Sequence, residues 1–507
     1  MRAFLSKLEV PHPPNEPRPT ALLSHDVKPI EKERRVWTWP AFIALWSTVA
    51  FNMSNFQIGS SMLAIGLNWW QSFLTMLFGH LLAAILVVAA SFPGLYYNIS
   101  FPIATRIAWG YCGSIFVVLN RIILSIVWCG VQSWQGGLMT YVCLRAIWPG
   151  IDSVKNTIPA STGMNLSQFI GFVVYFIIQL PFLFLSPQRL RYLVYVGSLG
   201  GFLVHSQLSW MCVYSISVTI SSITSGTVSV CDYARFAKRP VSGIWSQALG
   251  FLPGWLSNVF GILTIAATQN RYGAELWSVA SLLIAMQDAN GDSKTRVGVF
   301  FVGLAFGISQ ISLNVVGNSF SGGTDMASLL PKYINIRRGQ LLTAFLGLVI
   351  NPWYLLSGAV IFISVMSAYT IFLQPFLGIL VAHYFVIQQR RIKVSDLYCV
   401  GSKSIYWYSA GINWRSVVAW FIGVVPHIPG FLTTVNASIK VSLQASQMYY
   451  LCSFTGFLLP FLAAIALHWL FPVKAQTELK FDFGVIQGEE DLHGKINEAT
   501  DEMEQKA

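Results

Sequence analysis

Apolar segments of about the length of a membrane-spanning helix follow one another along most of this chain of 507 residues. A helix needs about 20 apolar residues to cross a bilayer, and it satisfies its own backbone hydrogen bonds in lipid. The sequence therefore predicts an all-α, polytopic membrane protein with about twelve spans. The segments lie at residues 40–63, 69–91, 114–144, 167–186, 191–207, 209–231, 245–268, 297–320, 340–356, 358–387, 415–436 and 448–471.

The distribution of charge supports this interpretation. Only 10% of the residues are charged, against about 25% in soluble domains. Basic residues gather in every second connection, and the positive-inside rule places those connections and both termini in the cytoplasm. The net charge of +11 is thereby explained without a nucleic-acid partner. The clusters are Lys32, Arg34 and Arg35; Arg106; Arg189 and Arg191; Arg235, Lys238 and Arg239; Lys332, Arg337 and Arg338; and Arg390, Arg391 and Lys393.

The chain divides into five regions. Residues 1–36 are expected to form a polar cytoplasmic tail, and residues 472–507 an acidic, mostly disordered one. Trafficking or ubiquitination machinery is the class of partner expected at these tails. Residues 37–207 and 208–388 are expected to form two five-helix repeats, and residues 389–471 two further helices. The fifth span has little room before the sixth, so we expect it to be shortened.

Two short phrases indicate the repeat. Residues 128–137 read WCGVQSWQGG and residues 314–323 read NVVGNSFSGG, so Gln132 aligns with Asn318 when the glycine pairs are superposed. The phrases fall on segments 3 and 8, which are mates if segments 1–5 and 6–10 are two halves. Segments 1 and 6 are then also mates, and both are expected to be interrupted, within 52–61 and 221–227. Paired interrupted spans point to the central site of a transporter.

Each phrase places amides on one helical face. The first face carries Trp128, Gln132 and Gln135, and the second carries Gln310, Asn314 and Asn318. Unpaired amides in lipid cost several kcal/mol, so both faces are expected to meet protein or a polar cavity.

An amide side chain presents a carbonyl acceptor beside an NH₂ donor. That arrangement matches the –CO–NH– edge of uracil, allantoin, hydantoins or oxopurines, and the Trp128 ring offers a flat face on which such a ring can stack. The alternative is that the amides join helices to one another, and spacing alone leaves both interpretations open. Gln57, in the expected break of segment 1, either contacts substrate or satisfies freed backbone groups.

Few ionisable residues lie in the spans. Asp232, at the end of segment 6, is expected to pair with Arg235 or another basic residue nearby. The histidines His80, His383, His427 and His468 are expected to be lone, structural residues, with His383 the strongest candidate among them for proton movement. The seven cysteines are scattered without a CxxC pair, so neither disulfides nor a zinc site is predicted. No nucleophile elbow, Walker loop or HExxH pattern is present, so we predict neither an enzyme nor a cofactor.

Five stretches carry a family resemblance: GLNWWQS (66–72), WCGVQSWQGG (128–137), CDYARFAKRP (231–240), NSFSGGTDMASLLPKYINIRRGQ (318–340) and RRIKVSDLY (390–398). From about residue 30 to 475 the chain resembles the nucleobase–cation symporter family 1, in particular its fungal uracil/allantoin permease branch. The resemblance implies two inverted five-helix repeats, as in the leucine-transporter fold, and cation symport of a small heterocycle. It assigns ring stacking to Trp128, edge contacts to Gln132 and Asn318, and a further polar contact to Gln57.

The chain departs from the family pattern at several positions. Segment 6 lacks the Asn and Pro that usually precede Asp232, about 20 residues are missing before segment 6, and His383 stands in place of an aspartate. Leu313 follows Ser312 where sodium-using relatives carry a hydroxyl. Hard cations need several oxygen ligands, so the leucine favours a proton as the symported cation. Ser312, Asp232 and His383 are the residues considered for cation movement.

The expected function is a plasma-membrane, proton-coupled importer of uracil, allantoin or a related neutral heterocycle such as uric acid or a hydantoin. A thiamine, uridine or cytosine carrier of the same family is one alternative. A transport-inactive variant or sensor is another.

Overall fold

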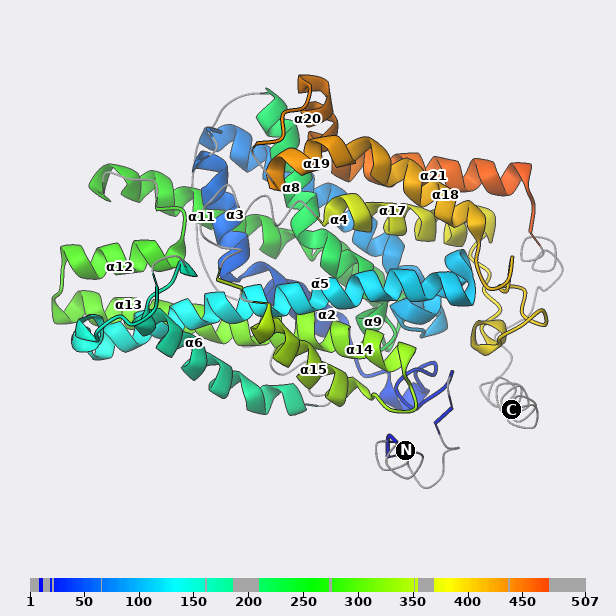
Figure 1. The fold of residues 1–507 in the computed structure, drawn as a ribbon, viewed down its shortest axis with the longest axis horizontal. Helices are drawn as coiled ribbons and strands as arrows, with labels where there is room; N and C mark the ends of the chain where they lie inside the picture. Colours follow the sequence, from blue (N-terminus) through cyan, green and yellow to red (C-terminus); the bar gives the residue numbers. More distant parts are fainter. Residues whose placement is uncertain are drawn as a thin grey trace.

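The computed structural model describes residues 9–11, 19–20, 22–64, 66–159, 162–185, 209–272, 276–350, 352–353, 369–435 and 438–473. Within these ranges every regular element is a helix, apart from two isolated bridges. Nine of the described helices are long and apolar enough to cross a membrane. The long helices run alongside one another, and α5 (Phe101–Ile147) extends across most of the molecule near its centre (Figure 1).

Most of the predicted spans are present as helices in the described residues. The fifth, at 191–207, lies outside the described residues, and so do the end of the ninth and the start of the tenth. Segments 2, 4 and 6 are the single helices α4 (Trp69–Tyr97), α6 (Leu166–Gln179) and α8 (Ser209–Val228). Segments 7 and 8 are each divided into two helices, α10 (Pro240–Ala248) with α11 (Phe251–Tyr272), and α13 (Ser293–Leu313) with α14 (Phe320–Leu329). Segments 9 and 10 contain α15 (Ile336–Val349) and α17 (Thr370–Val381), segment 11 contains α18 (Trp414–Val424) with α19 (Ile428–Val435), and segment 12 contains α21 (Cys452–Leu470).

Among the described residues, two α-helices were not predicted: α12 (Val279–Ala289), between spans 7 and 8, and α20 (Leu443–Tyr450), most of which precedes segment 12. Segment 3 begins earlier than predicted, since α5 starts at Phe101 and bends at Gly110, whose φ is 74°. That left-handed conformation favours glycine.

The first span is broken, although not where the sequence predicted. α2 (Trp39–Ala50) ends before Phe51, and α3 begins at Met53 and continues to Ala64. Nearly all of the stretch 52–61 is therefore helical, and Gln57 lies on α3 rather than in the break. The polar residues of 52–61 suggested an irregular backbone, but they lie on a helix, where they face neighbouring helices or cap the break.

Backbone carbonyls freed at this break have side-chain partners. Asn55 Nδ2 donates to the carbonyl oxygens of Val49 at 2.7 Å and Ala50 at 3.1 Å. Ser309 of α13 donates from its hydroxyl to the carbonyl oxygen of Phe51. Broken helices are tolerated in lipid only where the freed groups are satisfied in this way.

The predicted interruption of span 6 at residues 221–227 is wrong. α8 continues through Val228 and is followed by the short α9 (Val230–Ala234). The hydroxyls of Ser221, Thr224 and Thr227 donate to the carbonyls four residues earlier, at 2.7, 2.8 and 3.0 Å. The hydroxyls thereby find partners within the helix, so a stretch rich in serine and threonine does not need to interrupt it.

The segment before the first span packs against the helix ends instead of extending from them. Val27 and Ile30 are buried. The carboxylate of Asp26 accepts the backbone N–H of Ile336 at 3.0 Å, and the hydroxyl of Tyr398 donates to the carbonyl of Val27 at 3.0 Å. Part of the predicted tail therefore belongs to the folded body.

The second half of the broken span crosses span 7 at very short range. A Cβ at Gly59 of α3 would lie 2.0 Å from the carbonyl oxygen of Asn258, and a Cβ at Gly261 of α11 would lie 2.0 Å from the carbonyl oxygen of Phe56. Only glycine allows two helix backbones to approach this closely. α3 and α11 therefore pack as one unit.

We expect Gly59→Ala to lower the Tm of the purified protein, because the new methyl group must push α3 away from α11 at a cost of about 1–3 kcal/mol. Gly298→Ala on α13 is the control, since a Cβ there would meet nothing within 4 Å. The control should leave Tm unchanged or slightly raised, because alanine favours helix. Equal effects of the two substitutions would contradict the close crossing.

Candidate functional site

A network of hydrogen-bonded amides joins three helices inside the molecule. Gln310 of α13 donates from Nε2 to Oε1 of both Gln132 and Gln135 of α5, at 2.8 Å each. Gln135 Nε2 donates to Oε1 of Gln57 on α3 at 2.8 Å. Ser54 of α3 donates to Gln135 Oε1 at 2.6 Å and accepts from Gln132 Nε2 at 3.0 Å. All five side chains are buried, so the amides predicted on separate spans meet in one place.

A second group of amides lies one turn further along span 8. Between α13 and α14 the helix widens into a π-helical turn, η5 (Asn314–Ser319). Asn314 Nδ2 donates to Ser133 Oγ at 2.8 Å and to Gln179 Oε1 at 3.1 Å, and Asn318 Nδ2 donates to Asn314 Oδ1 at 3.1 Å. π-helical turns inside α-helices occur frequently at functional sites, and this one carries a predicted site residue.

The two tryptophans of the span-3 phrase have different surroundings. Trp134 is buried and packs edge-on against Phe172 and Trp353, with ring centroids 5.7 and 5.9 Å away. Trp128 is only partly buried and packs against two apolar clusters, one contributed largely by α5 and α17 and the other by α3, α4, α8 and α11. Of the two rings, Trp128 is thus the more exposed.

The structure brings three of the four predicted substrate contacts into hydrogen-bonded groups. Gln57 and Gln132 belong to the first network, and Asn318 to the second group, while Trp128 lies one turn from Gln132 on α5. The bonds seen are those expected of amides that join helices. The two amide faces could be found from helical spacing, but Ser54 and Gln179 were missed because single polar residues carry no such pattern.

A buried ion triad joins spans 3, 6 and 8, and sequence reasoning missed it. Arg121 of α5 donates from Nε and Nη2 to the carboxylate of Asp325 on α14, and from Nη2 to Asp232 Oδ2 on α9 at 2.6 Å. Asp232 Oδ1 also accepts the backbone N–H of Phe101 at 2.9 Å. Asp232 was expected to pair with Arg235 or another basic residue nearby, and its partner is Arg121. Arg235 Nε instead donates to the backbone carbonyl of Asp232 at 3.3 Å.

The other two cation candidates lie in separate surroundings. His383 is in a π-helical turn, η7 (Ala382–Ile387), and its ring meets that of His468 edge-on with centroids 4.5 Å apart. His383 and His468 were expected to be lone histidines, which is wrong. Ser312 is fully buried on α13, one turn from Ser309, whose hydroxyl reaches the break of span 1.

Long apolar helices around a buried polar centre define a membrane transporter, and comparison with known proteins identifies the family. A family model described as "Permease for cytosine/purines, uracil, thiamine, allantoin" matches residues 29–211 and 195–456. The allantoin permease of Saccharomyces cerevisiae is 32% identical over 494 residues, which cover 91% of this chain and 78% of that protein. The uracil permease of the same yeast is 34% identical over 487 residues, which cover 89% and 76%. The chain belongs to this family of permeases, whose members are transporters and not enzymes.

A solved structure supports the fold. Mhp1, described as a nucleobase-cation-symport-1 family transporter in a closed conformation with bromovinylhydantoin bound, is 21% identical with a TM-score of 0.67. The match covers 90% of this chain and 99% of Mhp1. The predicted all-α fold with two inverted five-helix repeats is thereby confirmed.

We expect Gln310→Leu to weaken the contact between α5 and α13. The substitution removes the donor that Gln132 and Gln135 share, at a cost of about 1–3 kcal/mol, so the Tm of the purified protein should fall. A double-mutant cycle with Gln135→Leu is the control, because bonded residues show non-additive losses. Fully additive losses would contradict the hydrogen bond.

Proposed function

We propose that the protein imports a neutral planar heterocycle with a cyclic –CO–NH– edge, of the uracil or allantoin type, by proton symport across the plasma membrane with both termini cytoplasmic. The amide network is the observation that carries this proposal. An incoming –CO–NH– edge offers the same donor and acceptor that the network amides offer one another. Substrate therefore exchanges one set of amide hydrogen bonds for another, and no charge is buried.

We assign each proposed contact a role. Trp128 stacks on the ring, and Gln132, Gln57 and Asn318 bond to its edges. Gln310 holds the carbonyl of Gln132 at 2.8 Å and so sets the direction of that amide. Gln310 is thus a positioning residue for the edge contact.

Uptake of labelled compounds tests this proposal. Cells that lack their own carriers should, when they express the chain, take up uracil, allantoin or a close analogue with saturation. Uridine, cytosine and thiamine belong in the panel because the family model and related carriers include them. Uptake of thiamine alone would contradict an edge-pairing site, because thiamine is a cation. A protein at the plasma membrane that moves none of the panel would instead be a transport-inactive variant or sensor.

Trp128→Ala should weaken substrate binding by roughly 10- to 100-fold, because ring stacking contributes about 1–3 kcal/mol. Trp128→Phe should retain part of the affinity. The control is Trp148→Ala at the end of α5, where the side chain is 56% exposed and distant from the network in sequence. Normal transport by Trp128→Ala at normal surface expression would show that the ring does not bind substrate.

The ion triad is the proposed path for the coupling proton. Asp232 and Asp325 share hydrogen bonds from a single guanidinium, that of Arg121. Arg235, which directly follows α9, donates to the backbone carbonyls of Asp232 and Asp26. It does not bond to the carboxylate of Asp232 or of Asp325. One cation bonded to two buried carboxylates leaves one of them available for a proton, because an unneutralised buried charge is costly.

We expect uptake to rise as external pH falls, to collapse with a protonophore and to be unaffected when sodium is replaced by choline. Asp325→Asn or Asp232→Asn should remove the pH dependence, since the proton carrier is then fixed in a neutral form. Asp288→Asn is the control, because Asp288 pairs with Arg145 at 2.6 Å and is 58% exposed. Uptake that follows sodium at constant pH would contradict the proposal and point to Ser312 and the carbonyl groups of the span-1 break.

A further inference from the structure

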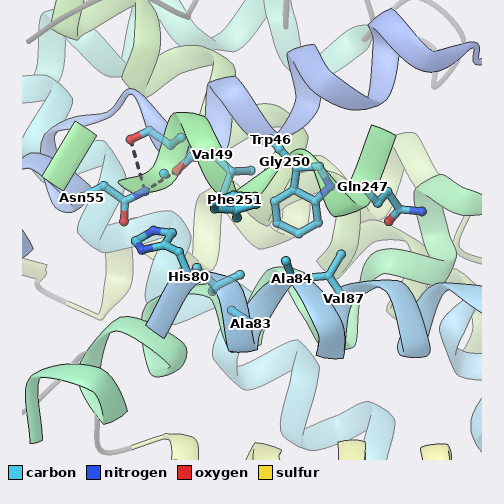
Figure 2. Close-up of a pocket in the computed structure, with 13 residues that line it drawn as sticks. Trp46, Val49, Asn55, His80, Ala83, Ala84, Val87, Gln247, Gly250 and Phe251 are labelled. Atoms are coloured by element: carbon cyan, nitrogen blue, oxygen red, sulfur yellow. Dashed lines mark hydrogen bonds between the residues drawn. The ribbon is translucent and has the colours of Figure 1, made fainter. Parts of the chain in front are cut away.

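A small cavity lies outside the amide network, at the junction of two bent spans. It is bounded by α2, α3, α4, α8 and the bend that joins α10 to α11, and most of its lining is apolar. Figure 2 shows Asn55 and His80 at one end, Gln247 at the other, and the ring of Trp46 between them. No charged residue lines this cavity among the described residues.

Four polar atoms of the lining have no hydrogen-bond partner among the described residues. They are His80 Nε2, Trp46 Nε1, and both Nε2 and Oε1 of Gln247. His80 is 1% exposed, Trp46 is 6% exposed and Gln247 is 1% exposed. Buried polar groups in proteins are almost always satisfied, by protein or by ordered water.

The four atoms include both donors and acceptors. His80 Nδ1 lies 2.9 Å from the carbonyl oxygen of Met76, so Nδ1 carries the proton and Nε2 is left as an acceptor. Trp46 Nε1 is a donor, and the Gln247 amide is both. A ligand for this lining must therefore donate and accept hydrogen bonds.

Two glycines of span 7 let its backbone lie against these two rings. A Cβ at Gly254 would lie 2.6 Å from Nε2 of His80, and a Cβ at Gly250 would lie 2.6 Å from the indole of Trp46. A side chain at either position would displace the ring beside it.

We propose that this cavity binds ordered water molecules, which donate to His80 Nε2 at one end, bond to the amide of Gln247 at the other and accept from Trp46 Nε1 between them. Buried waters bond to otherwise unsatisfied polar groups, and this lining offers such groups at both of its ends. A lipid chain would fit the apolar wall but has no donor for His80. Water is the occupant that satisfies all four atoms.

The position of the cavity gives the water a role. Val49 and Ala50, whose carbonyls are freed at the break of span 1, line it together with Asn55, which bonds to both carbonyls. The opposite wall is the bend of span 7 at Gly250. The water thus binds where both spans depart from a straight helix and provides hydrogen bonds to that junction.

Hydroxyl-radical footprinting by X-ray radiolysis of the full chain in lipid nanodiscs tests the proposal. Radicals form from water, so Trp46 should be oxidised several-fold faster than Trp109, a tryptophan 2% exposed that does not line the cavity. An oxidation rate at Trp46 no higher than at Trp109 would overturn the proposal, and it is the result expected of a dry or lipid-filled cavity.

A second measurement uses the sign of a stability change. If water is bound, Gln247→Leu displaces the water at its end of the cavity and leaves Trp46 Nε1 unsatisfied, so Tm and the oxidation rate at Trp46 both fall. If the cavity is dry, the leucine removes an unsatisfied amide and Tm rises, which overturns the proposal. Gln340→Leu is the control, since both of its amide atoms also have no partner among the described residues but it does not line the cavity. It should leave the Trp46 oxidation rate unchanged.

Discussion

Inside a bilayer a polar side chain has no bulk water to bond to, and this constraint determines how the helices meet around α5. That helix carries Arg121 at one level and Gln132 with Gln135 about three turns further on. Each level is matched by side chains from other spans, carboxylates at the first and amides at the second. The helices packed on α5 are therefore held in register by hydrogen bonds as well as by apolar contact.

The same constraint explains a site without a permanent charge. Ligand pockets usually combine an apolar wall with a few polar groups that fix orientation. Here the polar groups are amides that largely bond to one another, while Gln310 Oε1 and Gln179 Nε2 have no partner among the described residues. Under the proposed function, selectivity would depend on how well a ring edge reproduces the donor and acceptor order of the amides that it displaces.

The sequence predicted what is repeated or periodic and missed what depends on distant pairing. Hydropathy located the spans, and helical spacing placed Gln132 with Gln135 and Asn314 with Asn318 on common faces. The partners of Arg121 lie 111 and 204 residues away, so no local pattern connects them. The sequence predicted the break of span 1 too far along the chain, because Asn55 and its polar neighbours suggest an irregular backbone. These residues lie on α3, and Asn55 bonds from there to the carbonyls of the break. The π-helical turns left no trace in composition, since they depend on how the helix packs.

The π-helical turn of span 8 lies between Gln310, which belongs to the amide network, and Asp325, which belongs to the ion triad. Gln310 lies before the turn, Asn314 and Asn318 lie within it, and Asp325 follows it on α14. A residue advances an α-helix by about 100°, and a π turn holds one residue more than an α turn. Conversion of the turn to α geometry would rotate Asp325 by about that angle about the axis of span 8, away from Arg121, and would lengthen the span slightly because an α-helix rises about 1.5 Å per residue. A change in the hydrogen bonds of Asn314 and Asn318 that converted this turn would therefore rotate Asp325 relative to Arg121.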